Sequence, residues 1–253
     1  MTEPRALDGR REAPSANLLL LSNSVGADGY LAHALDAIRT WWALGEAPGE
    51  AVFVPFAGVV RDWDAYAELV AGALERLGIP LRPLHRAADM QALLAGATHV
   101  VVGGGNTFHL LYELRRRGLL APLADRVRQW HCSYLGWSAG ANLACPTIRT
   151  TNDMPVVDPG GFDALAAVPF QINPHFTQVH PSGHRGETRL QRLQEFCALN
   201  PDVPVWALPE GTGLHVGAQG MRVLGGPVFL LAGDGDLRQV PEGPVAATVA
   251  ARR

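Results

Sequence analysis

The chain has 253 residues, of which 47% are hydrophobic and 18% are charged, with a formal net charge of -3. This apolar content is enough to form one sizeable core. The chain has no excess of positive charge with which to bind a nucleic-acid backbone or an anionic membrane. A small molecule or a peptide is the expected partner. Cys132, Cys145 and Cys197 have spacings of neither a disulfide framework nor a zinc site, so buried or spare thiols are predicted.

The amino-terminal segment lacks the features of a signal peptide. Residues 1–16 carry charges and two prolines but no apolar stretch, and no later run reaches membrane-spanning length. A cytoplasmic protein is therefore expected. Because nothing in residues 1–16 repeats at a helical or strand period, this segment is predicted to be a mobile tail, and residues 17–253 to form a single domain.

Strand-length apolar runs alternate with longer amphipathic segments. Such alternation buries each strand between helices, which predicts an α/β fold with a mostly parallel sheet and helices on both faces. Functional residues are then expected at the carboxyl ends of the strands. The predicted strands are Leu18–Leu21, Ala51–Phe56, Leu81–His85 and His99–Val102, and the predicted helices are Tyr30–Trp42, Trp63–Leu77, Met90–Leu94 and Thr107–Arg117.

The pattern loosens in the second half of the chain. Residues 146–174 are rich in Pro and Gly and are too long for an ordinary connection, so a functional loop is expected there. Residues 186–199 regain a helical period. From Pro204 onward, short strands joined by Gly-containing turns are predicted.

A Gly-x-Ser-x-Gly pentapeptide spans residues 136–140, after a short apolar strand and before a helix start. This is the arrangement of a nucleophile elbow. Small residues let the helix and strand approach closely, and the serine occupies a strained turn with its hydroxyl exposed. We therefore predict Ser138 as a catalytic nucleophile.

Three glycines, residues 103–105, end a predicted strand just before a predicted helix. A tetrahedral oxyanion needs donors already aimed at it, and backbone amides in such a turn can supply them. We predict an oxyanion hole formed by the amides of Gly104, Gly105 and Ala139. A phosphate cradle is a competing interpretation, but no Gly-Lys-Ser/Thr follows and the dinucleotide fingerprint fails. A plain strand-to-helix turn is the structural alternative.

A serine nucleophile needs a general base, and the chain has nine histidines. His175 is the first choice because it follows a short apolar run and Pro174, which stiffens the approach. The alternatives are His180, His184 and His215.

An acid must orient the imidazole of the base. Asp153 gives the chain order Ser, Asp, His, which occurs in unrelated serine hydrolases. Glu210 ends a predicted strand and is an equally good candidate. Either residue could instead be a turn acid that caps neighbouring amides.

Together these segments resemble the peptidase E family, the α-aspartyl dipeptidases of a serine peptidase group that also includes cyanophycinase-like enzymes. The resemblance extends from about Leu18 to about Leu231. It is densest in residues 54–58, 103–108, 136–142, 146–158 and 172–176. The chain departs from the family mainly in residues 1–16 and at its end, outside the matching motifs.

The resemblance implies a fold similar to class I glutamine amidotransferase domains. It also implies a dipeptidase that hydrolyses the bond after an amino-terminal Asp through an acyl-enzyme, with no metal and no organic cofactor. Ser138 would be the nucleophile and His175 the base, with either Asp153 or Glu210 as the acid. The implied substrates are small peptides with an amino-terminal Asp. No nucleic-acid or membrane partner is expected, and a homodimer is one option for assembly.

Selectivity for Asp requires a cation or amides that bind the side-chain carboxylate. The candidate cations are Arg149, Arg185 and Arg189, each of which could instead be a solvated arginine. The acid that is not in the triad could bind the free ammonium of the substrate. The candidate substrate-binding residues are Asn106, Thr107, Arg149, Arg185 and Arg189.

Other functions are compatible with the same fold. One is a serine hydrolase with a different or broader peptide substrate. Another is a catalytically silent ligand-binding domain, although the presence of Ser138, His175 and both candidate acids argues against it. A thiol amidotransferase would need Cys at position 138 and is discounted.

Overall fold

The structure is a computed structural model that describes residues 16–45, 49–179, 183, 185–233 and 235–246. The predicted tail, apart from its last residue, lies outside the described residues, as do the alternative bases His180 and His184. Among the described helices, none combines the length and the apolar character needed to cross a membrane.

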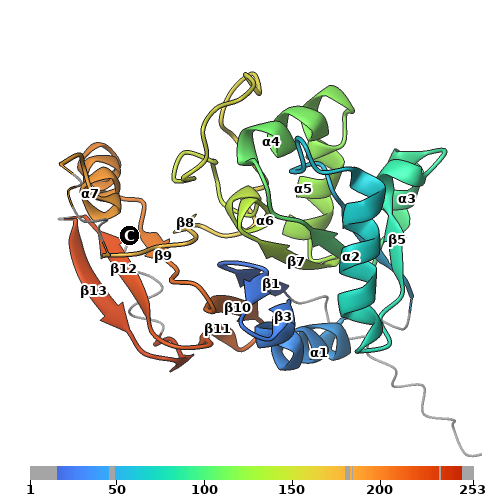
Figure 1. Cartoon of the computed structure of the whole chain (residues 1–253), viewed down its shortest axis with the longest axis horizontal. Coiled ribbons are helices and arrows are strands. Elements are labelled where there is room, and N and C mark those ends of the chain that lie inside the picture. Colours follow the sequence, from blue (N-terminus) through green and yellow to red (C-terminus); the bar gives the residue numbers. More distant parts are fainter. Residues whose placement is uncertain (1–15, 46–48, 180–182, 184, 234, 247–253) are drawn as a thin grey trace, which may run out of the picture.

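Two sheets form the frame of the molecule (Figure 1). The strands of the larger sheet are β1 (Asn17–Leu21), β4 (Ala51–Val54), β5 (Leu81–Pro83), β6 (His99–Val102), β7 (Ser133–Trp137), β10 (Gly213–Gly217), β11 (Gly220–Leu224) and β14 (Gly243–Pro244). The second sheet contains β8 (Gln171–Asn173), β9 (Val205–Ala207), β12 (Val228–Ala232) and β13 (Asp236–Val240). A separate ribbon pairs β2 (Val25–Gly26) with β3 (Gly29–Tyr30).

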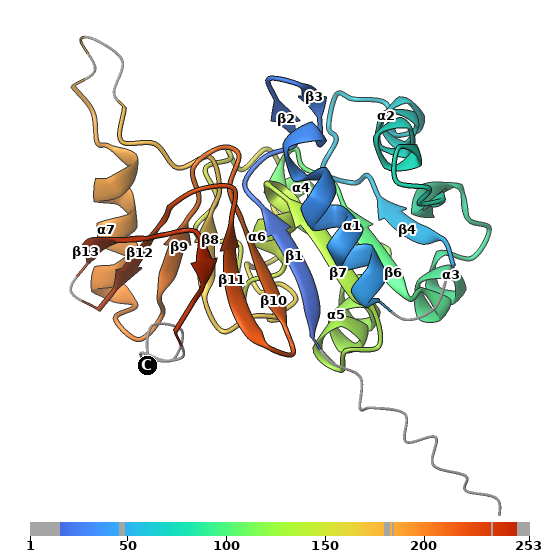
Figure 2. The same ribbon diagram turned by 90° about the horizontal axis from the view of Figure 1, so that it is seen from below.

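The larger sheet has a parallel half, as the sequence predicts, and an antiparallel half formed by β10, β11 and β14. Its order is β14-β11-β10-β1-β7-β6-β4-β5, and the five strands from β1 to β5 run parallel. The second sheet has the order β13-β12-β9-β8, in which β8 and β9 are parallel. Figure 2 shows β10 and β11 between β1 and the second sheet. In chain order, the polypeptide crosses between the two sheets four times, after β7, β9, β11 and β13.

The helices mostly follow the predicted segments. They are α1 (Leu35–Leu44), α2 (Trp63–Glu75), α3 (Met90–Gly96), α4 (Thr107–Arg116), α5 (Leu120–Arg128), α6 (Ala139–Leu143) and α7 (Arg189–Leu199), with short 3-10 helices at Ala32–Ala34 and Leu84–Arg86. Helix α5 was not predicted.

Several predicted boundaries differ by about two residues or more, and two of the differences have a clear local cause. The helix expected from Tyr30 begins later, because Tyr30 pairs with Val25 in the ribbon and Leu31 has a left-handed φ of 55°. The strand expected to reach His85 stops at Pro83, which lacks the N–H needed to continue a ladder, and a 3-10 helix follows.

Alternate residues of the central strand β1 face two cores. Leu18 and Leu20 pack with buried side chains of α3, α4, α5 and α6. Leu19 and Leu21 pack with those of α1 and α2. Since side chains alternate between the faces of a strand, the all-leucine run is covered by helices on both sides. The predicted fold class is confirmed.

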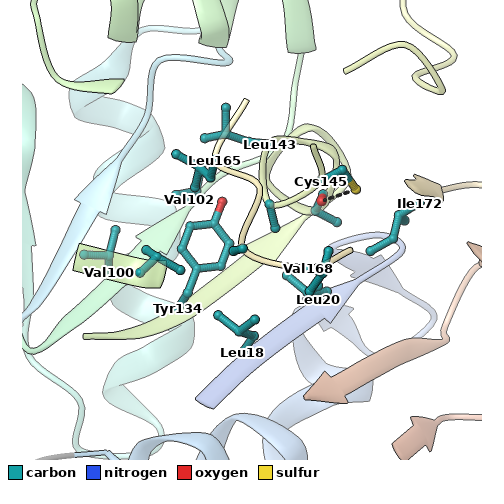
Figure 3. Close-up of a cluster of buried hydrophobic side chains, with 14 of the residues drawn as sticks. Leu18, Leu20, Val100, Val102, Tyr134, Leu143, Cys145, Leu165, Val168 and Ile172 are labelled. Atoms are coloured by element: carbon teal, nitrogen blue, oxygen red, sulfur yellow. Dashed lines mark hydrogen bonds between the residues drawn. The ribbon is translucent and has the colours of Figure 1, made fainter. Parts of the chain in front are cut away.

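Figure 3 shows the part of the core beneath α6. Tyr134 is fully buried there, and its hydroxyl donates to the Gly140 carbonyl oxygen over 2.7 Å. Cys145 is also fully buried, and burial raises the pKa of its thiol. All three cysteines are buried, in line with the prediction made for them. This packed region supports the turn between β7 and α6 from below.

The second sheet is joined to the larger one by buried polar contacts. Helix α7 packs on it through Leu193 and Cys197. The contact with α6 is made by the Asn142 side-chain amide, which donates to the Ile172 carbonyl oxygen of β8 over 2.6 Å. The Ser22 hydroxyl donates to the Leu208 carbonyl oxygen over 2.9 Å. Because β8 and β9 are parallel, the residues that follow them emerge side by side at the same end of the second sheet.

Candidate active site

Ser138 occupies the turn between β7 and α6. It has φ 52° and ψ −113°, a strained conformation for a residue with a side chain, and its N–H donates to the Leu21 carbonyl oxygen over 3.0 Å. The helix lies very close to the strands here, because a Cβ on Gly140 would come within 2.3 Å of the Val102 carbonyl oxygen. The turn has the form of a nucleophile elbow.

His175 lies directly opposite this serine. Its Nε2 is 2.9 Å from Ser138 Oγ, a hydrogen-bond distance, and its Nδ1 is 3.1 Å from Glu210 Oε1. The backbone N–H of His175 donates to the Ser22 hydroxyl over 2.9 Å, which ties the loop after β8 to the larger sheet. Serine, imidazole and carboxylate thus form a continuous chain of the kind used in acyl transfer.

Asp153, the other candidate acid, is bound to Thr107 and Thr151 and not to His175. Its Oδ2 accepts a hydrogen bond from the Thr107 backbone N–H over 2.7 Å, and further bonds from the hydroxyls of Thr107 and Thr151. Of the two candidate acids, the structure brings Glu210 against His175. Thr107 was expected to contact substrate, but its side chain is fully buried and holds Asp153. That expectation was wrong, because a fully buried side chain cannot contact substrate in the cleft.

A cleft of about 610 Å³ opens above the serine, and its walls include Gly104, Gly105, Ser138, Asp153 and His175. The glycine loop lies against the nucleophile, since a Cβ on Gly104 would be 3.1 Å from the Ser138 Cβ. Within the described ranges, the N–H groups of Gly104 and Gly105 have no backbone acceptor.

The amide after the nucleophile is available too. Ala139 is the first residue of α6, so its N–H has no carbonyl oxygen one turn earlier in the helix to bind. These are the amides expected to form an oxyanion hole, and all belong to segments that border the cleft.

Comparison with known proteins gives the family of the chain. The model of peptidase family S51 matches residues 18–224. The chain belongs to peptidase family S51. It is 54% identical to peptidase E of Salmonella typhimurium (strain LT2) over 211 residues, which are 83% of this chain and 90% of the relative. Peptidase E of Salmonella typhi shows the same identity and coverage.

Solved structures share the fold. A candidate peptidase E from Listeria monocytogenes EGD-e superposes with a TM-score of 0.56 at 22% identity, covering 83% of this chain and 98% of that one. A peptidase from an acI-B1 actinobacterium gives 0.62 at 17% identity, covering 90% and 96%. The S51 assignment confirms the family resemblance, and the chain is a serine-type peptidase.

A second, smaller cavity of this S51 peptidase shares Asp153 with the cleft. It has a volume of about 240 Å³, and Arg149, Arg189 and Arg192 lie in its wall. Arg189 Nη1 is buried without a hydrogen-bond partner among the described residues. Burial lowers the pKa of Arg189, with repulsion from Arg192 adding to the effect and the Glu210 charge opposing it.

The other candidate arginines are differently placed. Arg149 donates from Nη2 to Asn200 Oδ1 over 3.0 Å and lies over the Phe196 ring at 5.2 Å. Arg185 is exposed and lines neither the cleft nor the smaller cavity. Of the three, Arg189 is the one with a buried guanidinium nitrogen that has no hydrogen-bond partner in the described part of the chain.

Two further candidates of the S51 peptidase are accounted for by their contacts. Asn106 borders the cleft, but its Oδ1 caps α4 through the His109 N–H and its Nδ2 donates to the Met154 carbonyl oxygen over 2.8 Å. His215 was an alternative base. It lies on β10, where Nε2 is 3.0 Å from Asn17 Oδ1 and burial lowers its pKa, and it borders neither cavity of the site.

Proposed function

We propose that this S51 peptidase hydrolyses the peptide bond after an amino-terminal Asp in small peptides, through an acyl-enzyme on Ser138. The observation that carries the proposal is the buried Nη1 of Arg189, which has no hydrogen-bond partner among the described residues, in the wall of a cavity that shares Asp153 with the cleft. A guanidinium and a carboxylate pair through charge-assisted hydrogen bonds, and Arg suits this task because its donors are fixed in a plane. The name peptidase E of its relatives supports peptides as the substrates.

In the proposed mechanism, Ser138 Oγ attacks the carbonyl carbon of the Asp residue while His175 Nε2 takes its proton. The amides of Gly105, Gly104 and Ala139 bind the oxyanion. His175 then gives the proton to the departing amine, and the C–N bond breaks. Water attacks the acyl-enzyme by the same route, releasing aspartate and restoring the serine. Glu210 accepts a hydrogen bond from His175 Nδ1–H and so holds the imidazole in the tautomer whose Nε2 can take the serine proton.

Asp153 is proposed to bind the free ammonium of the substrate. Its Oδ2 already accepts from Thr107 and Thr151. Its Oδ1 has no hydrogen-bond partner in the described part of the chain, and Asp153 borders both the cleft and the arginine cavity. An ammonium bound there would be next to a side-chain carboxylate bound to Arg189. Such a pair of subsites requires an unblocked amino-terminal residue and so favours exopeptidase action.

The proposal is tested with a panel of peptides. Asp-Leu, Glu-Leu, Asn-Leu, Ala-Leu and amino-blocked Asp-Leu are incubated with the protein, and released leucine is measured. We expect cleavage of Asp-Leu with little or no cleavage of the other four. Cleavage of all five peptides would support a serine hydrolase but would contradict the proposed preference for Asp. If the blocked peptide is cleaved as fast as Asp-Leu, the ammonium subsite is wrong.

Arg189→Gln is expected to lower kcat/KM for Asp-Leu by about 10- to 100-fold, because a hydrogen bond to a charged group contributes about 1.5–3 kcal/mol. The residual rate with Asn-Leu should change much less, since its amide carries no charge. The matched control is Arg185→Gln, which removes an exposed arginine outside both cavities and should leave both rates unchanged. An unaltered ratio of Asp-Leu to Asn-Leu rates in Arg189→Gln would exclude this arginine from recognition.

A further inference from the structure

The Gly104–Gly105 peptide of the cleft is anchored by a buried tyrosine. Tyr66, on α2, is 1% exposed, and its hydroxyl lies 3.0 Å from the Gly104 carbonyl oxygen. The same hydroxyl lies 3.2 Å from Trp137 Nε1 and 3.3 Å from the Tyr30 hydroxyl. Tyr66 is not part of the proton-transfer chain and belongs to none of the sequence motifs.

The direction of each hydrogen bond in this cluster follows from the chemistry of the groups. An indole N–H can only donate and a carbonyl oxygen can only accept. Trp137 therefore donates to the Tyr66 oxygen, and the single hydroxyl proton of Tyr66 goes to the Gly104 carbonyl oxygen. Tyr30 must then be a donor to Tyr66 as well. Every member of the cluster is satisfied, which fixes the Tyr66 hydroxyl in one orientation.

Without that anchor, the Gly104–Gly105 peptide would be free to rotate. It is flanked by two glycines, which rotate at little steric cost, and Gly105 has φ 142°, a conformation that other residues rarely adopt. In a trans peptide the C=O and N–H groups point in opposite directions. Holding the Gly104 carbonyl against buried Tyr66 therefore turns the N–H of Gly105 away from the core, on the side where Gly105 is exposed.

We propose that the Tyr66 hydroxyl is a positioning group for the oxyanion hole, because it holds the Gly104 carbonyl and so keeps the Gly105 N–H aimed into the cleft. A rotated peptide would present the Gly104 oxygen to the developing oxyanion and would repel it. The inference rests on the proposed role of Ser138 but is independent of which peptide is cleaved.

The test compares Tyr66→Phe with Tyr30→Phe, a matched control that also loses one hydroxyl of the cluster but leaves the bond to Gly104 in place. The first readout is the rate at which a fluorophosphonate probe labels Ser138, since its phosphoryl oxygen occupies the same hole. The second is kcat and KM for Asp-Leu, with the affinity for the product aspartate as a measure of ground-state binding.

Tyr66→Phe is expected to slow labelling and lower kcat by about 10- to 100-fold, because loss of an oxyanion donor has effects of about this size or larger. KM, aspartate affinity and the thermal unfolding midpoint should change little, and Tyr30→Phe should keep at least a third of the wild-type rate. Replacing Tyr66 with 4-aminophenylalanine, which restores a donor, should recover part of the loss.

Equal labelling rates for Tyr66→Phe and the wild type would overturn the inference. So would an equal loss in both tyrosine variants, because that would indicate general packing. If the probe labels the wild-type protein but the protein does not cleave Asp-Leu, only the proposed substrate is contradicted. The comparison of labelling rates does not depend on the peptide.

Discussion

Ser138→Ala is expected to lower the rate of Asp-Leu hydrolysis by about 10⁴-fold or more, because the variant lacks the hydroxyl that contacts His175 Nε2 and forms the acyl-enzyme. Binding of Asp-Leu should persist, since Arg189 and Asp153 remain in place. The measurements are leucine release, with and without a chelator, and the affinity for Asp-Leu by calorimetry. Metal-independent chemistry predicts the same rates in both conditions.

The control for this variant is Ser24→Ala, which changes a second serine in the wall of the cleft. It should keep most of the activity. Retention of substantial hydrolysis in Ser138→Ala, or loss of wild-type activity on adding the chelator, would contradict the proposed mechanism. Circular dichroism of both variants checks that the fold is intact.

Glu210→Gln is expected to lower kcat by about 100-fold or more with KM almost unchanged, because the amide no longer stabilises the charged imidazole and can favour the wrong tautomer. The Glu210 side chain is 66% exposed, so solvent screens its charge. The loss should therefore be smaller than the roughly 10⁴-fold loss found when a buried triad acid is changed. Steady-state kinetics with Asp-Leu measure it.

Asp153→Asn is the paired variant for the other candidate acid. It should raise KM by about 10-fold or more while keeping most of kcat, because an amide oxygen still accepts from Thr107 but no longer attracts an ammonium. The reverse pattern, with kcat lost in Asp153→Asn and kept in Glu210→Gln, would place Asp153 in the triad. The two kinetic profiles therefore separate the roles that the sequence left open.

Local patterns were enough to predict half of the fold. Alternating apolar runs and amphipathic segments specify strands buried between helices, and β1, β4, β6 and the helices α2 to α4 lie close to their predicted bounds. The turn around Ser138 was equally predictable, because strand, small residues and helix start are neighbours in the chain. The strand assignments failed where a local residue interrupted the pattern, as Pro83 does at the end of β5.

The second sheet and the choice of acid depended on tertiary structure. Glu210 meets His175 because β8 and β9 run parallel, although the two residues are separated by the whole of α7. No spacing in the sequence encodes that pairing, so Asp153 was an equal candidate. Thr107 and Tyr66 show the same limit, since their partners are 46 and 38 residues away.

Neighbouring residues encode the local features: the parallel half of the sheet, the elbow that holds Ser138, and the glycine loop beside it. Those features arise from steric and hydrogen-bonding preferences of adjacent residues. Three features of the site required the folded chain instead: the contact of Glu210 with His175, the Arg189 Nη1 that lacks a partner among the described residues, and the Tyr66 hydroxyl at the Gly104 carbonyl. Each of these depends on distances between residues far apart in the chain, and those distances are set by strand pairing and core packing.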